Sequence, residues 1–150
     1  MTKREIAINY FNNGYNCAQS VVAAFAEDFG VDKKTALMMS EGFGGGMGRM
    51  RLTCGAVTGM FFIVGLKYSK GQAGDLDTRM KIYETVRELA KEFEEKMGST
   101  VCSELLGGNI PKDKSARPEE RTKEYYKKRP CPEIVGIAAE ILEKHLMGDR

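Results

Sequence analysis

Apolar side chains recur every three or four positions along most of this chain, and no other feature of the sequence constrains its fold as strongly. The longest such run lies between Asp75 and Met97, with apolar residues at positions 76, 80, 83, 86, 90, 93 and 97. A period of three to four residues is that of an amphipathic α-helix. No segment shows the strict alternation of a half-buried strand, so the sequence predicts an all-α fold.

Capping residues divide the chain into six or seven predicted helices. The pairs Thr2/Glu5 and Asn16/Gln19 have the spacing of capping boxes. The other predicted helix starts are Asp32, Thr53, Asp75, Ser99 and Pro132. The apolar residues 56–66 predict a buried central helix, preceded by a glycine-rich loop at 42–48. Because 150 residues suit one domain, we expect a single compact bundle over residues 1–150, with a polar connector at about 111–129.

The charge and the apolar segments argue against two classes of partner. The chain has 23 basic and 21 acidic residues, and a net charge of +2 is too small for us to expect a nucleic-acid-binding protein. A bilayer-spanning helix needs about 20 apolar residues, and the segment 56–66 is much shorter, so we expect no membrane insertion. The first eight residues lack the apolar core of a signal peptide, and we therefore expect a cytoplasmic protein.

The residues suited to redox or metal chemistry are four cysteines and one histidine. The single histidine, His145, excludes sites that need two histidine ligands, and its place in the last predicted helical turn favours an ordinary surface role. Cys17, Cys54, Cys102 and Cys131 are separated by 37, 48 and 29 positions, so the chain has no CxxC pair. Structural disulfides are rare in the cytoplasm, and dispersed cysteines there favour redox chemistry or metal binding.

All four cysteines are predicted to lie in the first turn of a helix. Unpaired N–H groups and the positive end of the helix dipole stabilise a thiolate at such a position. The predicted catalytic residues are therefore Cys17, Cys54, Cys102 and Cys131. We expect Cys54 to be the attacking thiol, because Arg49 and Arg51 precede it closely. The alternative is that the cysteines are buried and pack as small apolar side chains.

Five glycines lie in the loop at 42–48, but the loop fits no nucleotide-binding motif. Neither the G-x-G-x-x-G spacing nor the Walker pattern is met in any register. A glycine-rich backbone can still wrap a small inorganic group or direct N–H groups at sulfur, which makes Gly44, Gly45 and Gly46 predicted cofactor-binding residues. The alternative is a plain tight connection between two helices.

Gly55 and Gly59 lie four positions apart on the predicted central helix, in the sequence Cys54-Gly55-Ala56-Val57-Thr58-Gly59. Each glycine costs a helix about 1 kcal/mol relative to alanine. We infer that another helix or a ligand approaches the bare backbone at these two positions. Both glycines therefore join the predicted cofactor-binding residues.

These residues resemble a bacterial and archaeal family named for its C-GCAxxG-C-C signature. The CGAxxG box is complete at residues 54–59, residues 14–21 resemble the opening block around the first cysteine, and residues 42–46 match the glycine loop. Cys102 and Cys131 occupy the last two cysteine positions, so the resemblance covers nearly the whole chain. It implies a redox-active protein without an established substrate. A similar domain in some cytochromes is associated with an iron–sulfur cluster.

Three functions remain open at the level of the residues. The first is a redox-active protein, such as a thiol-dependent oxidoreductase, whose thiolates undergo thiol–disulfide exchange or electron transfer without a cofactor. The second is a module in which the four cysteines bind one [2Fe–2S] cluster or one zinc ion. The third is a non-catalytic helical interaction protein. A redox partner protein and a small oxidant both fit the first function, and a homo-oligomer is compatible with all three.

Overall fold

The computed structural model describes residues 1–107, 115–123, 125 and 130–148. These residues form seven α-helices, two short 3-10 helices and no strand, which confirms the predicted all-α fold. The α-helices are α1 (Lys3–Asn12), α2 (Cys17–Phe25), α3 (Lys33–Ser40), α4 (Gly55–Tyr68), α5 (Leu76–Met97), α6 (Cys102–Leu106) and α8 (Cys131–Met147). The 3-10 helices are η1 (Ala26–Phe29) and η2 (Glu41–Phe43).

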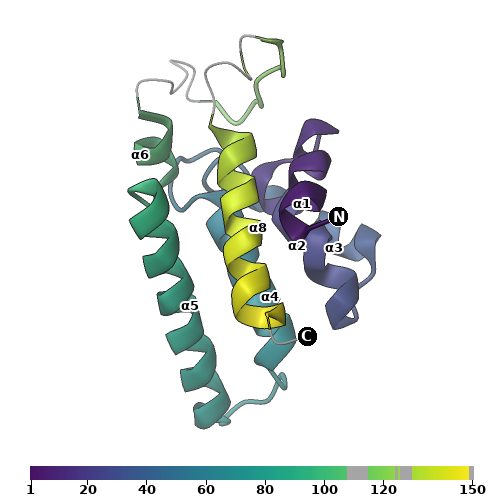
Figure 1. Ribbon diagram of the computed structural model, residues 1–150, viewed down its shortest axis with the longest axis vertical. Helices are drawn as coiled ribbons and strands as arrows, with labels where there is room; N and C mark the ends of the chain where they lie inside the picture. Colours follow the sequence, from purple (N-terminus) through teal and green to yellow (C-terminus); the bar gives the residue numbers. More distant parts are fainter. Residues whose placement is uncertain (108–114, 124, 126–129, 149–150) are drawn as a thin grey trace.

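The core lies where α4 and α8 meet the other long helices. In Figure 1, α8 runs down the middle of the molecule between α1 and α5, and α4 lies behind it. The most extensive helix contacts are those of α1 with α8 and of α2 with α4. Phe11, Phe25, Met60, Phe93 and Ile141 are fully buried in one shared apolar cluster. Eight residues of α4 are buried, so the glycine-rich loop does precede a buried central helix.

Helix starts follow the predicted capping chemistry at the N-terminal half and shift slightly elsewhere. Asn16 and Gln19 form both bonds of a capping box, while the Thr2, Asp32 and Asp75 side chains each accept one backbone N–H. Three predicted starts are wrong by one or two residues. Cys54, Val101 and Pro130 are the caps in place of Thr53, Ser99 and Pro132. For the first two the cause is tertiary, because Thr53 and Val101 pair with each other in an isolated antiparallel bridge.

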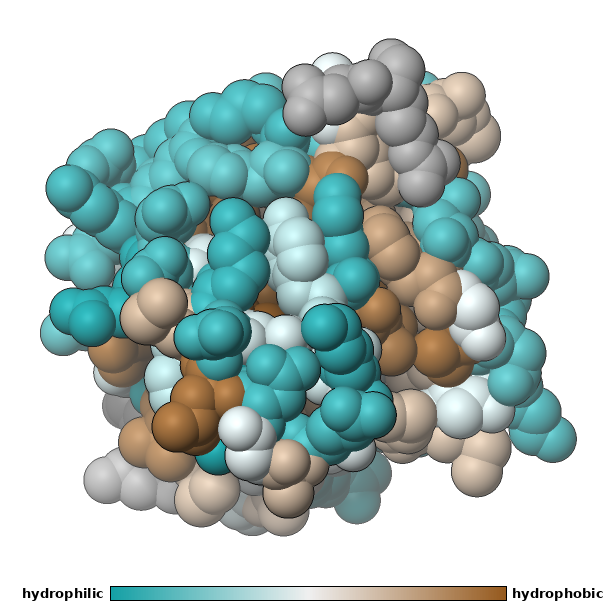
Figure 2. All heavy atoms as spheres, turned by 90° about the horizontal axis from the view of Figure 1, so that it is seen from below, coloured by the Kyte–Doolittle hydropathy of each residue, from teal (hydrophilic) through white to brown (hydrophobic). Residues whose placement is uncertain are grey.

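The apolar stripe predicted on α5 is buried over only part of its length. Leu76, Met80 and Tyr83 are 67%, 57% and 61% exposed, whereas Leu89 and Phe93 are fully buried. Figure 1 shows the reason, since the first turns of α5 extend beyond the end of α8 and have less to pack against. On the face seen in Figure 2, hydrophobic side chains lie in separate groups among hydrophilic ones. Isolated exposed apolar groups are ordinary on protein surfaces.

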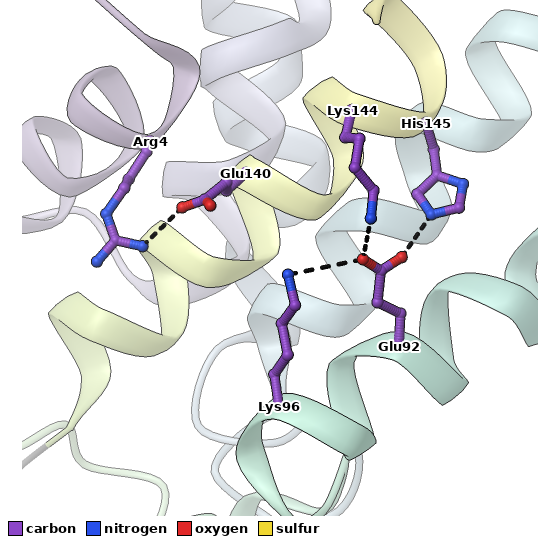
Figure 3. A network of polar contacts seen from close by, with 6 residues as sticks. All are labelled: Arg4, Glu92, Lys96, Glu140, Lys144 and His145. Atoms are coloured by element: carbon purple, nitrogen blue, oxygen red, sulfur yellow. Dashed lines mark hydrogen bonds and ion pairs between the residues drawn. The ribbon is translucent and has the colours of Figure 1, made fainter.

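A surface network centred on Glu92 joins α5 to α8 (Figure 3). The Glu92 carboxylate accepts from Lys144 of α8 and lies 2.5 Å from Nε2 of His145. Lys96, one turn further along α5, lies 3.6 Å from the same carboxylate. His145 therefore takes part in a surface contact between helices, in agreement with the role expected for it.

The charge of Glu92 makes this contact dependent on pH. Desolvation alone raises the pKa of Glu92, but the bonds from Lys144 and His145 outweigh it and lower the pKa from 4.5 to about 2. A lowered carboxyl pKa contributes stability that is present above pH 4.5 and is lost as the pH falls toward 2. We expect Glu92→Gln to reduce the free energy of unfolding by about 1 kcal/mol at pH 7. In urea titrations from pH 7 to pH 2, the difference from the unmodified protein should shrink below pH 4.5. A difference independent of pH would contradict the assignment.

Two further predictions concern membrane insertion and the polar connector. Among the described residues, no helix combines the length and apolar character needed to span a membrane. Of the predicted connector at about 111–129, residues 115–123 and 125 are described, and the rest lies outside the described residues. Residues 117–122 take no helical conformation.

Candidate functional site

A single cavity of about 320 Å³ is lined by all four cysteines. Positions separated by as many as 114 residues in sequence thus meet at one place. The glycine-rich loop forms one wall, and the α6 residues Leu105 and Leu106 contribute apolar surface. The charged residues along the cavity are Glu41, Arg49, Arg51, Glu119 and Arg121.

Each cysteine lies at the start of a helix, as the sequence predicts. Cys17, Cys102 and Cys131 are the first residues of α2, α6 and α8, and Cys54 is the residue that caps α4. In Figure 1, α4 and α8 both begin in the upper half of the molecule, where α6 also lies. The cavity is therefore built from helix starts that the fold brings to the same end.

Backbone pairing holds Cys54 beside Cys102. Thr53 and Val101 form an isolated antiparallel bridge. On one side of it, the Cys54 N–H donates to the Thr100 carbonyl at 2.8 Å, and on the other the Cys102 N–H donates to the Leu52 carbonyl at 2.6 Å. This pairing joins segments almost 50 residues apart, so no local sequence signal indicates it.

The glycine-rich loop approaches the sulfurs with bare backbone. Gly45 and Gly46 have φ angles of +65° and +73°, which favour glycine. The backbone N–H of Gly45 lowers the pKa of Cys17, so the loop directs an N–H group at a sulfur, which is one of the two roles expected for it. A side chain at Gly46 would come within 2.7 Å of the Cys102 Cβ, and one at Gly44 would collide with Asn16. The role of Gly44, Gly45 and Gly46 in holding a cofactor stays a prediction.

The two glycines of the CGAxxG box allow α4 to pack closely on α2. A Cβ at Gly55 would lie 2.5 Å from the Cys17 sulfur and 2.8 Å from the Phe43 carbonyl oxygen. A Cβ at Gly59 would lie 3.0 Å from the Cβ of Val21. The cost of glycine in a buried helix is thus offset by helix packing at Gly59 and by room for a sulfur at Gly55.

Burial, and not the helix start, controls the protonation of Cys54 and Cys17. Desolvation raises the pKa of Cys54 well above its ordinary value, and the nearby thiols of Cys17 and Cys102 raise it further. The N–H groups of Val57 and Ala56 lower that pKa, as expected at a helix start, but by less. Desolvation also raises the pKa of Cys17, against the bond from Gly45. The prediction that Cys54 is the most activated thiol is therefore wrong for this structure.

Arg51 contacts a different cysteine from the one that follows it in sequence. Its Nη1 lies 3.7 Å from the Cys102 sulfur, as a donor. Arg49 donates to the Ser115 carbonyl at 2.9 Å. Neither arginine is among the main influences on the pKa of Cys54, so the expected activation of Cys54 by these two arginines is also wrong. Because Thr53 is paired with Val101, the chain before it lies alongside the start of α6, and Arg51 meets Cys102 there.

Arg121 is a site residue that sequence reasoning missed. The connector that contains it reads as a solvated polar segment, yet its guanidinium donates to the Tyr15 carbonyl at 2.6 Å and also to the Phe11 carbonyl. The guanidinium carbon lies 4.0 Å from the centroid of the Phe11 ring. These contacts anchor the connector over the cavity next to α1. The preference of arginine for aromatic faces offers only a weak sequence signal.

The thiols of the cavity differ in exposure, and Cys17, Cys54 and Cys102 form no disulfide. Cys54 and Cys102 are buried, at 5% and 8% exposure, whereas Cys17 and Cys131 are half-buried. Within the part of the chain that the structure describes, no three Cys, His, Asp or Glu side chains lie close enough together to hold one metal ion. The arrangement in hand is therefore a set of neighbouring thiols around a small cavity.

An α-helical fold with four cysteines around one cavity defines a class of small cysteine-centred helical proteins. The chain belongs to the C_GCAxxG_C_C family, whose model carries the description "Putative redox-active protein (C_GCAxxG_C_C)" and matches residues 15–145. The matched region includes all four cysteines and the glycine loop. Searches of curated proteins and of solved structures yielded no significant match.

Proposed function

We propose that this protein is a thiol redox protein that exchanges two electrons by forming and breaking a disulfide among its cavity cysteines. The observation that carries this proposal is the convergence of Cys17, Cys54, Cys102 and Cys131 on one cavity of about 320 Å³. Membership of a family described as redox-active supports it. Thiols that cycle between the reduced and the disulfide form suit a reducing compartment, and we therefore keep the cytoplasm as the proposed location.

Three of the four thiols are the strongest candidates for the exchanging pair. The thiols of Cys17 and Cys102 raise the pKa of Cys54, and that of Cys102 raises the pKa of Cys17, so these three sulfurs lie within electrostatic range of one another. In the oxidation step, two thiols lose two electrons and two protons to an acceptor and become one disulfide. A low-molecular-weight disulfide is a sufficient acceptor, because it takes up both electrons as two thiols.

Thiol counting tests this function directly. Protein reduced under anaerobic conditions and freed of reductant is mixed with excess bis(2-hydroxyethyl) disulfide, and its thiols are counted before and after. We expect the loss of two thiols and a linked peptide pair drawn from Cys17, Cys54 and Cys102, identified by mass spectrometry. The Cys54→Ser and Cys102→Ser variants should each remove any link that uses the missing sulfur. A folded protein that keeps four reduced thiols, under conditions that oxidise the same chain in denaturant, would overturn the proposal.

The same convergence favours a second candidate function, a four-cysteine iron–sulfur or zinc module. Four sulfur donors around one cavity fit the ligand chemistry of a [2Fe–2S] cluster, and N–H groups from Gly45, Ala56 and Val57 would stabilise its charge. The ligands of a cluster also lie further apart than those of a single zinc ion. This favours the cluster over zinc, because no three possible ligands among the described residues lie around one ion position.

Metal analysis distinguishes the two functions. Protein purified without oxygen and without added metal is assayed for iron and zinc and examined for visible absorbance. Stoichiometric iron with visible absorbance would support the cluster and overturn the cofactor-free thiol function. One tightly bound zinc would assign the cysteines a structural role. Colourless protein without stoichiometric metal is the result that we expect.

A further inference from the structure

The Arg51 guanidinium lies beside Cys102 at the edge of the cavity, and most of its hydrogen-bonding capacity is unused. It donates to the Cys102 sulfur at 3.7 Å, and within the described part of the chain this is the one partner of its side chain. The side chain of Arg121 is instead occupied by two carbonyls and an aromatic ring. A guanidinium has five N–H donors, so Arg51 can bind a second acceptor while it contacts the sulfur.

The position of Arg51 is held at a conformational cost. Its φ angle is 61°, in the left-handed region, and Met47 and Arg49 share that conformation with φ angles of 68° and 65°. Such a conformation costs a residue with a Cβ about 1–2 kcal/mol. Two backbone hydrogen bonds hold this conformation. The Arg51 N–H donates to the Gly45 carbonyl at 3.1 Å, and the Arg51 carbonyl accepts from the Ser103 N–H at 3.3 Å. Strained backbone of this kind gathers at functional sites.

We propose that the cavity binds a small disulfide that carries a carboxylate, with the carboxylate on Arg51 and the disulfide sulfur at Cys102. Planar guanidinium groups recognise carboxylates through paired hydrogen bonds. The cavity volume of about 320 Å³ is within the range of small-molecule sites. Leu105, Leu106 and Ile134 give it apolar walls that suit the methylene and sulfur part of such a molecule.

The other charged side chains of the cavity do not by themselves favour an anionic ligand. Glu41 and Glu119 line the cavity together with the three arginines, so the net charge of the lining is close to zero. Selectivity for an anion therefore arises from the placement of Arg51 next to the reacting sulfur. The two glutamates by themselves would attract a cationic disulfide and repel an anionic one, so the contact with Arg51 has to outweigh them.

The reaction that follows is an exchange of one disulfide for another, and this step rests on the thiol function proposed above. The Cys102 thiolate attacks one sulfur of the bound disulfide, forms a mixed disulfide and releases the first small thiol. The thiolate of Cys17 or Cys54 then attacks the Cys102 sulfur, which forms the protein disulfide and releases the second small thiol. The small disulfide gains two electrons and two protons, and the two protein thiols lose them.

A comparison of three disulfides of different charge tests the inference. The reduced protein is mixed with 3,3′-dithiodipropionate, bis(2-hydroxyethyl) disulfide or cystamine, which are anionic, neutral and cationic. Each rate is divided by the rate for the same chain unfolded in denaturant, which removes differences in intrinsic reactivity. We expect the normalised rate for the anion to exceed that for the neutral compound by about tenfold, as for one charge-assisted contact. Cystamine should be the slowest of the three.

Variants at two arginines separate the effect of Arg51 from a general effect of charge. Arg51→Gln should remove the preference for the anion, and Arg51→Lys should retain part of it. Arg79→Gln, at an exposed position on α5, removes the same charge far from the lining of the cavity and should leave the preference unchanged. In the unmodified protein, succinate should slow the reaction with the anionic disulfide, which requires no variant to fold.

The outcomes distinguish this inference from the function on which it rests. Equal normalised rates for the three disulfides in the unmodified protein, or a preference that survives Arg51→Gln, would overturn the carboxylate site and leave the thiol function intact. Failure of all three compounds to oxidise the folded protein would overturn the thiol function as well.

Discussion

Replacement of Gly55 by alanine is expected to displace the Cys17 sulfur and to destabilise the protein by about 2–3 kcal/mol. The added Cβ would lie 2.5 Å from that sulfur and 2.8 Å from the Phe43 carbonyl oxygen. The sulfur can move by rotation of its side chain, but the carbonyl belongs to the backbone at the start of the glycine-rich loop and cannot. The loss of stability is measured by urea titration. The displacement of Cys17 is measured as a faster reaction of its thiol with iodoacetamide, mapped by mass spectrometry.

Gly65→Ala is the matched control on the same helix. A Cβ at Gly65 meets no heavy atom within 4 Å, and alanine is favoured over glycine in a helix by about 1 kcal/mol. We therefore expect this variant to be as stable as the unmodified protein or more stable, with unchanged labelling of Cys17. Equal stability of the Gly55→Ala and Gly65→Ala variants would show that α4 does not pack on Cys17 as closely as the structure has it.

The helices were predictable because their signals are local. The capping box of Asn16 and Gln19 and the cap at Asp75 each lie within four residues of the bonds they make. The same holds for the placement of cysteines at helix starts, since a cap residue and the first turn are neighbours in sequence. Where long-range pairing intervenes, as between Thr53 and Val101, the predicted start moves by a residue or more.

The chemistry of the site depended on contacts that local sequence does not contain. The distances between the four helix starts follow from packing, so the sequence indicated the cysteines but not their convergence. Burial reversed the expected protonation of Cys54, because desolvation outweighs the N–H groups of the first helical turn. Arg51 was assigned to Cys54 by adjacency and instead contacts Cys102, which is 51 positions away. The glycines were the best guide, since a residue that costs a helix stability requires a tertiary reason.

Gly46→Ala is the second substitution for which we expect a large effect, about 3 kcal/mol or more. Its φ angle is +73°, and an added Cβ would lie 2.6 Å from the Leu52 nitrogen, 2.7 Å from the Cys102 Cβ and 2.8 Å from the Arg51 Cα. These are backbone atoms and a Cβ, so no side-chain rotation relieves the collision. The loop must move away from α6, which separates Arg51 from Cys102 and exposes the Cys102 thiol. Denaturant titration measures the first effect, and iodoacetamide labelling of Cys102 measures the second.

Gly48→Ala isolates the part of this effect that comes from contact with the site. Gly48 lies in the same loop with a φ angle of +57°, yet a Cβ there meets no heavy atom within 4 Å. Alanine at either position pays the cost of a left-handed backbone, about 1–2 kcal/mol, and only Gly46→Ala adds the collision with Arg51, Leu52 and Cys102. We therefore expect Gly48→Ala to leave Cys102 protected and to be the more stable variant. Equal loss of stability and equal exposure of Cys102 in both variants would contradict this prediction. The glycines would then be required only for the backbone conformation of the loop, and not for its close approach to the sulfurs.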